Sequence, residues 1–310
     1  MISSKIKKLR QIFFRHDIDG YVVPKNDYYF NEYSSPDRLK LISNFDGTAG
    51  LAVILKKKNY LFVDGRYILQ AKSQSGKNFN IIEIHKKLPW KVLKHGTKIG
   101  FNPFCFTSSI LAKYFKNYFI LVPIYTELIS FNKSKKKTNK FYFLEDSISG
   151  ENSKIKIDKI LKFLHEDESD SIFVTAPENV AWLLNIRGKD NPYSPIPNCQ
   201  LILKKSGQIY LFTDKSKTKN LLKKKNLHKV NVIDENNIID FLNNFRSTKI
   251  IIDRSSCSLA YEKILKEKIK ISTKNDPIYK MKSIKNNIEL RNIIKSHIFD
   301  AVAVIKFLYW

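Results

Sequence analysis

Paired cysteines are missing from this sequence. Its three cysteines, Cys105, Cys199 and Cys257, are widely spaced, and none belongs to a Cys-x-x-Cys pair. An odd number at such spacing excludes a disulfide framework and a zinc ribbon. We therefore expect free, buried thiols in a protein from a reducing compartment.

Long apolar runs are missing as well. Residues 1–10 contain repeated lysines and no apolar core, so they do not have the pattern of a signal peptide. No run approaches the ~18 apolar residues that a membrane helix needs. From these absences we expect a soluble, cytoplasmic protein without a membrane partner.

Acidic residues are few beside basic ones. The chain has 55 Lys and Arg against 29 Asp and Glu, which gives a net charge of +26. The lysines are spread along the whole chain, and the densest runs, at 133–140 and 223–225, lie between periodic segments. No nucleic-acid-binding motif accompanies the charge, so a nucleic-acid partner is the weakest of our hypotheses.

Familiar catalytic motifs are also absent. The sequence has no H-E-x-x-H, P-loop, nucleophile elbow or dinucleotide fingerprint. The densest acidic cluster, His165–Glu168 followed by Asp170, lies at the end of a predicted helix. Metal ligands converge from several fixed elements, so this cluster predicts a solvated acidic turn. A lone His297 in an apolar helix indicates a core or interface histidine in preference to a general base.

The length of 310 residues predicts about two domains. Strands alternate with short helices over residues 1–130, which indicates an α/β fold. Residues 131–140 are rich in lysine without apolar periodicity and predict a linker. Residues 141–277 repeat the alternation of strands and helices, although the sequences of the two halves are only weakly similar.

The stretch 41–71 is the most informative part of the chain. Two apolar runs, Leu51–Leu55 and Tyr60–Val63, predict a hairpin, and glycine turns flank it. Glycine is scarce in this chain, so the turn glycines predict positive φ or a close backbone approach. The turn after the second strand presents Arg66. The alternatives are an ordinary hairpin or a scaffold for this arginine.

Two polar segments accompany this hairpin. Residues 26–38 are polar and aromatic without an apolar period, which indicates a surface loop with a function. Farther along, Arg187 and Asp190 follow a predicted helix. They predict either a local ion pair or a polar corner that faces another domain.

Within the C-terminal segment, residues 278–310, the sequence predicts a long helix over residues 286–310. Asn286 and Glu289 have the spacing of a capping box, and apolar residues then recur at helical spacing to Trp310. No residue that ends a helix follows. We expect such an apolar helix either to dock on the two domains or to belong to a further domain.

Five segments together match motifs of one known family. They are Asp37–Arg38, Ser43–Gly50, Asp64–Ala71, Ala181–Asp190 and Lys282–Asp300. Each motif alone is weak, but their order and spacing along nearly the whole chain are specific. On these residues the chain resembles the Xaa-Pro aminopeptidase (aminopeptidase P) family in its long three-domain form.

The resemblance implies an α/β fold of two tandem creatinase-like domains, each a mixed sheet flanked by helices, followed by a pita-bread catalytic domain. Members of the family carry two divalent, manganese-type metal ions on two Asp, one His and two Glu of that third domain. It would begin near Lys282 here, and we find no residues that replace those ligands. We therefore expect a fragment, the non-catalytic N-terminal portion of the enzyme, without a metal or other cofactor of its own and inactive alone.

The resemblance also implies a substrate contact. Arg66 matches the family arginine that contacts the bound peptide, and Glu32, Asp37 and Arg38 would support the same surface. The substrates of the full enzyme would be peptides with proline in second position. The alternative function is an oligomerisation or partner-binding module, which forms a homodimer or pairs with a separate catalytic half.

Overall fold

The computed structural model describes residues 2–33, 36–129, 139–219 and 230–310. Most of the linker predicted at 131–140 lies outside these residues. The sequence also predicts a helix over residues 219–225, and most of it lies outside the described residues as well. The chain divides into two compact units. Unit 1 comprises Met1–Lys137 and Arg254–Glu267, and unit 2 comprises Thr138–Asp253 and Lys268–Trp310.

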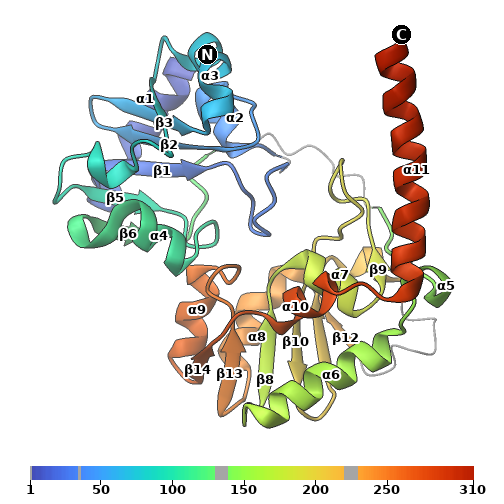
Figure 1. Cartoon of the computed structure of the whole chain (residues 1–310). Helices are drawn as coiled ribbons and strands as arrows, with labels where there is room; N and C mark the ends of the chain where they lie inside the picture. The colour runs from blue at the N-terminus through green and yellow to red at the C-terminus, as the bar shows by residue number, and fades with distance from the viewer. Residues whose placement is uncertain (1, 34–35, 130–138, 220–229) are drawn as a thin grey trace. The chain divides into compact units, whose positions relative to one another are not determined.

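Unit 1 is built on a mixed sheet with the strand order β4-β3-β2-β1-β5-β6 (Figure 1). The predicted hairpin is confirmed as β2 and β3, whose register pairs Leu51 with Phe62. The β1–β2–β3 pairs are antiparallel, whereas β3–β4, β1–β5 and β5–β6 are parallel. The strands are β1 (Gly20–Pro24), β2 (Gly50–Leu55), β3 (Asn59–Val63), β4 (Asn80–Glu83), β5 (Lys98–Phe101) and β6 (Ile120–Pro123).

Helices cover both faces of this sheet. One face packs on Leu9, Ile42 and Ala71 from the first three helices, and the other packs on Leu111 and Phe115 from the fourth. The helices of the unit are α1 (Ile2–Ile12), α2 (Arg38–Ser43), α3 (Ile68–Ser75), α4 (Ser108–Phe115) and α9 (Leu259–Lys266), with 3-10 turns η1 (Phe14–His16), η2 (Gly65–Tyr67), η3 (Pro89–Lys91) and η4 (Lys116–Tyr118). The sequence pattern does not predict α2, because six residues are too few to show a helical period.

Unit 2 repeats this architecture. Its sheet has the order β12-β11-β10-β8-β13-β14, and its strand directions match those of unit 1 position by position. The structure therefore contains a duplication that the sequence indicates only weakly. The strands are β8 (Ser171–Val174), β10 (Gln200–Lys204), β11 (Ile209–Phe212), β12 (Val230–Ile233), β13 (Lys249–Ile252) and β14 (Lys270–Thr273), and β7 (Tyr142–Phe143) pairs separately with β9 (Ile186–Arg187).

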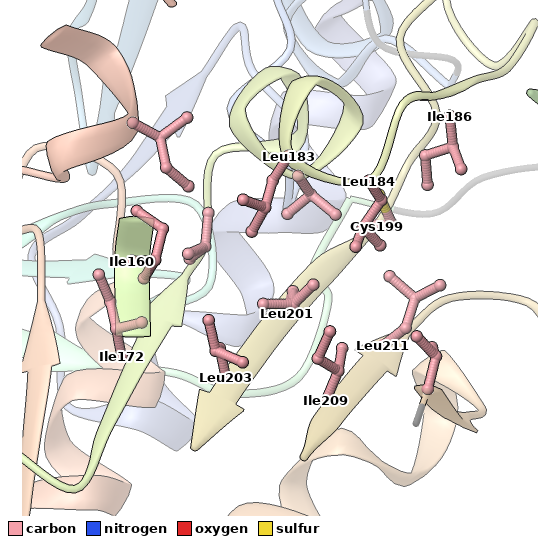
Figure 2. Packing of buried hydrophobic residues seen from close by; sticks show 14 of the residues in the cluster. Ile160, Ile172, Leu183, Leu184, Ile186, Cys199, Leu201, Leu203, Ile209 and Leu211 are labelled. Atoms are coloured by element: carbon pink, nitrogen blue, oxygen red, sulfur yellow. The ribbon is translucent and has the colours of Figure 1, made fainter. Parts of the chain in front are cut away.

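Along the strands of unit 2, buried side chains alternate between the two faces of the sheet. Leu201 and Leu203 face one apolar cluster with Leu183, as Figure 2 shows. On the other face, the Phe212 ring lies 5.2 Å from the ring of Phe241. The helices are α5 (Asp146–Ser149), α6 (Ser153–Glu166), α7 (Pro177–Leu183), α8 (Ile238–Asn244), α10 (Pro277–Ser283) and α11 (Asn287–Tyr309), with 3-10 turns η5 (Lys215–Thr218) and η7 (Glu235–Asn237).

The predicted capping box at the start of α11 is confirmed. The Asn286 side chain accepts from the Glu289 backbone, and the Glu289 side chain accepts from the Asn286 backbone. Within unit 2, Asn292 Nδ2 donates to the Ile148 carbonyl at 3.2 Å, next to α5. No residue of α11 is buried, so His297 is exposed instead of lying in a core. Within the described ranges, no helix combines the length and the apolar character needed to span a bilayer.

The acidic cluster at the end of α6 forms ion pairs. The Asp167 side chain is only 6% exposed, and it pairs with Lys249 at 3.1 Å and with Lys274. Asp170 pairs with Lys205. The expectation of a solvated acidic turn is therefore wrong for these two carboxylates, because lysines that are distant in sequence fold against them.

These ion pairs lower the pKa of both carboxyl groups. Burial raises the pKa of Asp167, but hydrogen bonds, led by that of Lys274, lower it overall to about 2. The hydrogen bond from Lys205 holds the pKa of Asp170 far below its ordinary range. Unfolded aspartate has a pKa near 3.9. The stabilisation is therefore present above about pH 4 and is lost as the pH falls through about 2.

The substitution Asp167→Asn tests this effect. We expect it to lower the free energy of unfolding by about 1–3 kcal/mol at pH 7, because two lysines lose their charged acceptor. The difference from the wild type should shrink at pH 2, where wild-type Asp167 is itself becoming protonated. Urea unfolding at both pH values measures this. Asp158→Asn, at an exposed position on α6, is the control. A difference of equal size at both pH values would contradict the ion-pair account.

Candidate functional site

Arg66 lies in η2, directly after β3. The Asp64 carboxylate begins this turn: its Oδ1 accepts from the Arg66 backbone nitrogen at 3.0 Å and from Arg66 Nε at 2.8 Å. The Arg66 side chain is 74% exposed. In the part of the chain that the structure describes, its two terminal nitrogens donate no hydrogen bond. The guanidinium is therefore fixed through Nε and presents its outer edge.

The electrostatics of this pair follow from the same contacts. The Arg66 side chain, its backbone nitrogen and, to a smaller extent, His85 lower the pKa of Asp64 to about 2. In return, the hydrogen bond to Asp64 raises the pKa of Arg66. Both groups are therefore charged at any physiological pH.

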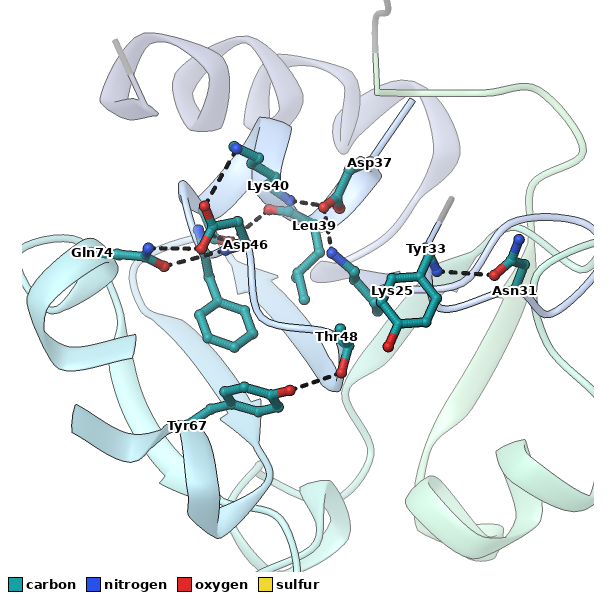
Figure 3. A network of polar contacts seen from close by, with 12 residues as sticks. Lys25, Asn31, Tyr33, Asp37, Leu39, Lys40, Asp46, Thr48, Tyr67 and Gln74 are labelled. Atoms are coloured by element: carbon teal, nitrogen blue, oxygen red, sulfur yellow. Dashed lines mark hydrogen bonds and ion pairs between the residues drawn. The ribbon is translucent and has the colours of Figure 1, made fainter. Parts of the chain in front are cut away.

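The glycine turn before β2 is tied to the same region (Figure 3). Thr48 Oγ1 and the Tyr67 hydroxyl are 2.8 Å apart. Asp46 Oδ1 accepts from Gln70 and Gln74 of α3 at 2.8 and 2.7 Å. These bonds connect the turn to both η2 and α3, so Arg66 extends from a braced scaffold.

The glycines of this turn allow neighbouring side chains to pack closely against the backbone. A Cβ on Gly47 would lie 2.3 Å from the Phe45 ring, and one on Gly50 would lie 2.8 Å from Leu39. Of the two predicted alternatives, positive φ or a close approach, the structure shows the close approach, because the described glycines with positive φ lie elsewhere, at 96, 150 and 207. Close packing against the two large side chains is what requires glycine here.

Asp37 and Arg38 lie at the start of α2. Asp37 caps this helix by accepting from the Lys40 backbone at 3.0 Å, and it also pairs with Lys25. Arg38 is buried, and its Nε donates to Glu127 at 2.7 Å. Burial alone would lower the pKa of Arg38, but nearby negative groups, Glu127 among them, raise it overall. Both residues thus anchor α2 within unit 1.

Glu32 lines a cavity of about 390 Å³ in unit 1. Asp64 and His85 line it as well. The structure therefore brings the carboxylates of Glu32 and Asp64 to one hollow beside η2. The Glu32 carboxylate also contributes to raising the pKa of Arg66, although it is the smallest of the contributions. Apolar walls come from Pro24, Phe30, Leu51, Ile84, Phe106 and Ile110.

His85 is the site residue that sequence reasoning missed. Its Nε2 lies 3.3 Å from Asp64 Oδ2, on the carboxylate oxygen that Arg66 does not use. The parallel pairing of β3 with β4 brings the two residues together, since the carboxyl ends of parallel neighbours meet at one edge. From the sequence, His85 could have been placed at the site only by predicting that β3 and β4 pair in parallel.

The described residues offer no metal centre. Among them, no group of three or more His, Cys, Asp or Glu side chains converges as a metal site would require. A di-nuclear centre therefore does not fit the side chains in the described ranges, and we derive no chemical step through one. The three cysteines are confirmed as free and buried, and burial raises the pKa of the Cys105 thiol to about 12.

The predicted local ion pair between Arg187 and Asp190 is not formed. Arg187 donates to the carbonyls of Ala181 and Ile186 at 3.0 and 2.8 Å. Asp190 pairs instead with Lys217 at 2.8 Å. The reason is the fold: β9 turns the arginine back onto the end of α7, and η5 supplies the lysine.

Two tandem mixed sheets with one common strand order define the class of this chain. The family described as "Creatinase/Prolidase N-terminal domain" matches residues 5–126, and a second family of the same description matches residues 132–289. The chain therefore belongs to the creatinase/prolidase N-terminal domain family. The predicted fold class, two tandem creatinase-type α/β domains, is confirmed.

Comparison with curated proteins identifies the relatives more closely. The chain is 30% identical to "Probable Xaa-Pro aminopeptidase P" of Laccaria bicolor, over 99% of this chain and 51% of the relative. It is 28% identical to "Xaa-Pro aminopeptidase 1" of Dictyostelium discoideum, over 100% of this chain and 53% of the relative. The resemblance to Xaa-Pro aminopeptidases is thus confirmed as homology along the chain. The chain spans about half the length of these relatives.

A solved structure shares the fold. The X-prolyl aminopeptidase from Caenorhabditis elegans, described as a cytosolic enzyme with a di-nuclear active site, matches with a TM-score of 0.87 at 23% identity. The match covers 100% of this chain and 56% of that chain. At this level of identity the likeness establishes the fold alone.

Proposed function

We propose that this chain forms the N-terminal, non-catalytic portion of a metal-dependent Xaa-Pro aminopeptidase. The observation that carries the proposal is the similarity over 99% of this chain to a relative that bears that name. The whole enzyme would act in the cytoplasm with two manganese-type ions, and it would remove the N-terminal residue that precedes proline. The proposal keeps the division into domains at 1–130 and 141–277, a linker at 131–140 and the start of a peptidase domain at 278–310.

Arg66 is the substrate contact in this proposal. A guanidinium presents its donors as a planar fork that matches carbonyl or carboxylate oxygens. Asp64 holds the Arg66 guanidinium through Nε, and the side chain is 74% exposed, so the two terminal nitrogens are available to a ligand. Because the turn is braced, little conformational freedom is lost when a peptide oxygen binds there.

Glu32, Asp37 and Arg38 have supporting roles in the proposal. Glu32 adds negative charge beside Arg66 from the wall of the cavity. Asp37 and Arg38 act at a distance, since they fix the start of α2 through Lys25 and Glu127. We assign the peptide contact to Arg66 alone and the shape of the surrounding surface to the other three.

The substitution Arg66→Gln tests the peptide contact. We expect it to weaken binding of the tripeptide Gly-Pro-Pro by about 10- to 100-fold, because hydrogen bonds to a charged group contribute about 1.5–3 kcal/mol. Isothermal titration calorimetry measures the affinity. Arg15→Gln, at an exposed position with the same change of charge, is the control. If both variants bind the peptide as tightly as the wild type, Arg66 is not a substrate contact.

An interaction module is the second candidate function, and α11 favours it. Ile294, Ile298 and Ile305 are 60%, 59% and 64% exposed and recur at helical spacing. An exposed apolar stripe of this kind is typical of a surface that binds another protein chain. The partner would be a second copy of the chain or a catalytic domain.

Sedimentation velocity tests the self-associating form of this candidate. We expect the wild type to associate with rising concentration and the triple variant Ile294→Gln, Ile298→Gln, Ile305→Gln to remain monomeric, since the apolar stripe is removed. Lys295→Gln, on the same helix, is the control and should behave as the wild type does. A wild-type protein that is monomeric at every concentration would leave no role for α11 in a homodimer.

A further inference from the structure

We propose that His85 is a positioning residue for Arg66: it holds one oxygen of the Asp64 carboxylate while the other oxygen holds the guanidinium. A protonated His85 binds the Asp64 carboxylate more strongly than a neutral one does. The carboxylate then neutralises less of the Arg66 charge, and Arg66 offers more positive charge to a peptide. This inference rests on the proposed role of Arg66 as a peptide contact. It assigns a pH-dependent control to that same site.

The geometry places the three side chains in one chain of contacts. Arg66 Nε donates to Asp64 Oδ1 at 2.8 Å, and His85 Nε2 lies 3.3 Å from Asp64 Oδ2. Each partner thus has its own oxygen of the carboxylate. Asp64 cannot rotate toward one partner without weakening its contact with the other.

The backbone fixes this arrangement from both sides. Asp64 directly follows β3, and the residue before it, Val63, pairs in register with Glu83 of β4. The Ile84 nitrogen donates to the Val63 carbonyl at 2.9 Å, so the segment that carries His85 is bonded to the end of β3. The contact between His85 and Asp64 is therefore set by sheet pairing and not by a free loop.

Other charged groups surround this contact. A Cβ on Gly65 would lie 3.2 Å from Glu83 Oε1, which places a second carboxylate against the turn, and Glu83 pairs with Lys86 at 2.7 Å. The titratable and charged groups that line the adjoining cavity are Lys25, Glu32, Asp64, His85 and Tyr114. Lys25 is already paired with Asp37, and among these groups Asp64 is the one in hydrogen-bond contact with His85.

Protonation of His85 strengthens its hydrogen bond to Asp64 and makes the site more positive. Histidine is the side chain whose charge ordinarily changes between about pH 5 and 8, and His85 is 71% exposed and open to solvent protons. A neutral ring donates a neutral hydrogen bond to Asp64, whereas a protonated ring donates a charge-assisted one. The carboxylate then neutralises two cations, and the site gains one positive charge. Binding of a peptide oxygen at Arg66 should tighten as the pH falls through this range.

The first experiment follows the His85 ring by NMR across pH 5 to 8. We expect the midpoint of its titration to fall in Asp64→Asn, which removes the acceptor, and to rise in Arg66→Gln, which leaves the carboxylate to His85 alone. The His95 ring, which stacks on Tyr118 at 4.3 Å, is the internal control and should not move. A His85 midpoint that neither substitution changes would overturn the proposal.

The second experiment separates this inference from the proposed function. Gly-Pro-Pro affinity is measured from pH 5 to 8 in the wild type and in His85→Gln, which keeps an amide donor without the charge. We expect the wild-type affinity to rise at low pH by about 1.5- to 5-fold more than that of the variant. Equal pH profiles would overturn control by His85. If the peptide does not bind at any pH while the NMR shifts occur, the coupling stands and the peptide role of Arg66 fails.

Discussion

The Asp64 carboxylate is the contact on which the site of unit 1 depends. It begins η2 by accepting from the Arg66 backbone, and with the same oxygen it fixes the Arg66 guanidinium. Its other oxygen meets His85. An exposed arginine without such a partner samples many rotamers, and its ordering on binding lowers affinity. One carboxylate at a strand end therefore converts a mobile surface cation into an oriented one.

The proposed peptide contact lies in unit 1, although the duplication gives both units the same turn. In unit 2, Asp214 lies two residues after the end of β11, much as Asp64 comes directly after β3, and it likewise accepts from the backbone two residues later, at Ser216, at 2.9 Å. The capping turn is thus common to both units. The position of Arg66 is occupied by Ser216, which has no guanidinium to offer. The same fold therefore carries the turn twice and the oriented arginine once at this position.

Local patterns predicted much of the fold and only part of the site. The β2–β3 hairpin and the Asn286 capping box follow from residues close in sequence, and both were predicted correctly. The His85–Asp64 contact depends on the parallel pairing of β3 with β4, and the burial of Asp167 depends on lysines from distant strands. Such long-range pairings leave no period in a single sequence. The common strand order of the two sheets was hidden for the same reason, because strand order is a property of the fold and not of local composition.

The central proposal is that this chain supplies a peptide-binding surface to an Xaa-Pro aminopeptidase, while its described residues lack the groups that perform hydrolysis. The most direct test is a hydrolysis assay of the purified chain on Gly-Pro-Pro with added manganese, beside the X-prolyl aminopeptidase of Caenorhabditis elegans as the active reference. The account predicts release of glycine by the reference and none above buffer by this chain. Turnover that increases in proportion to the concentration of this chain would contradict it.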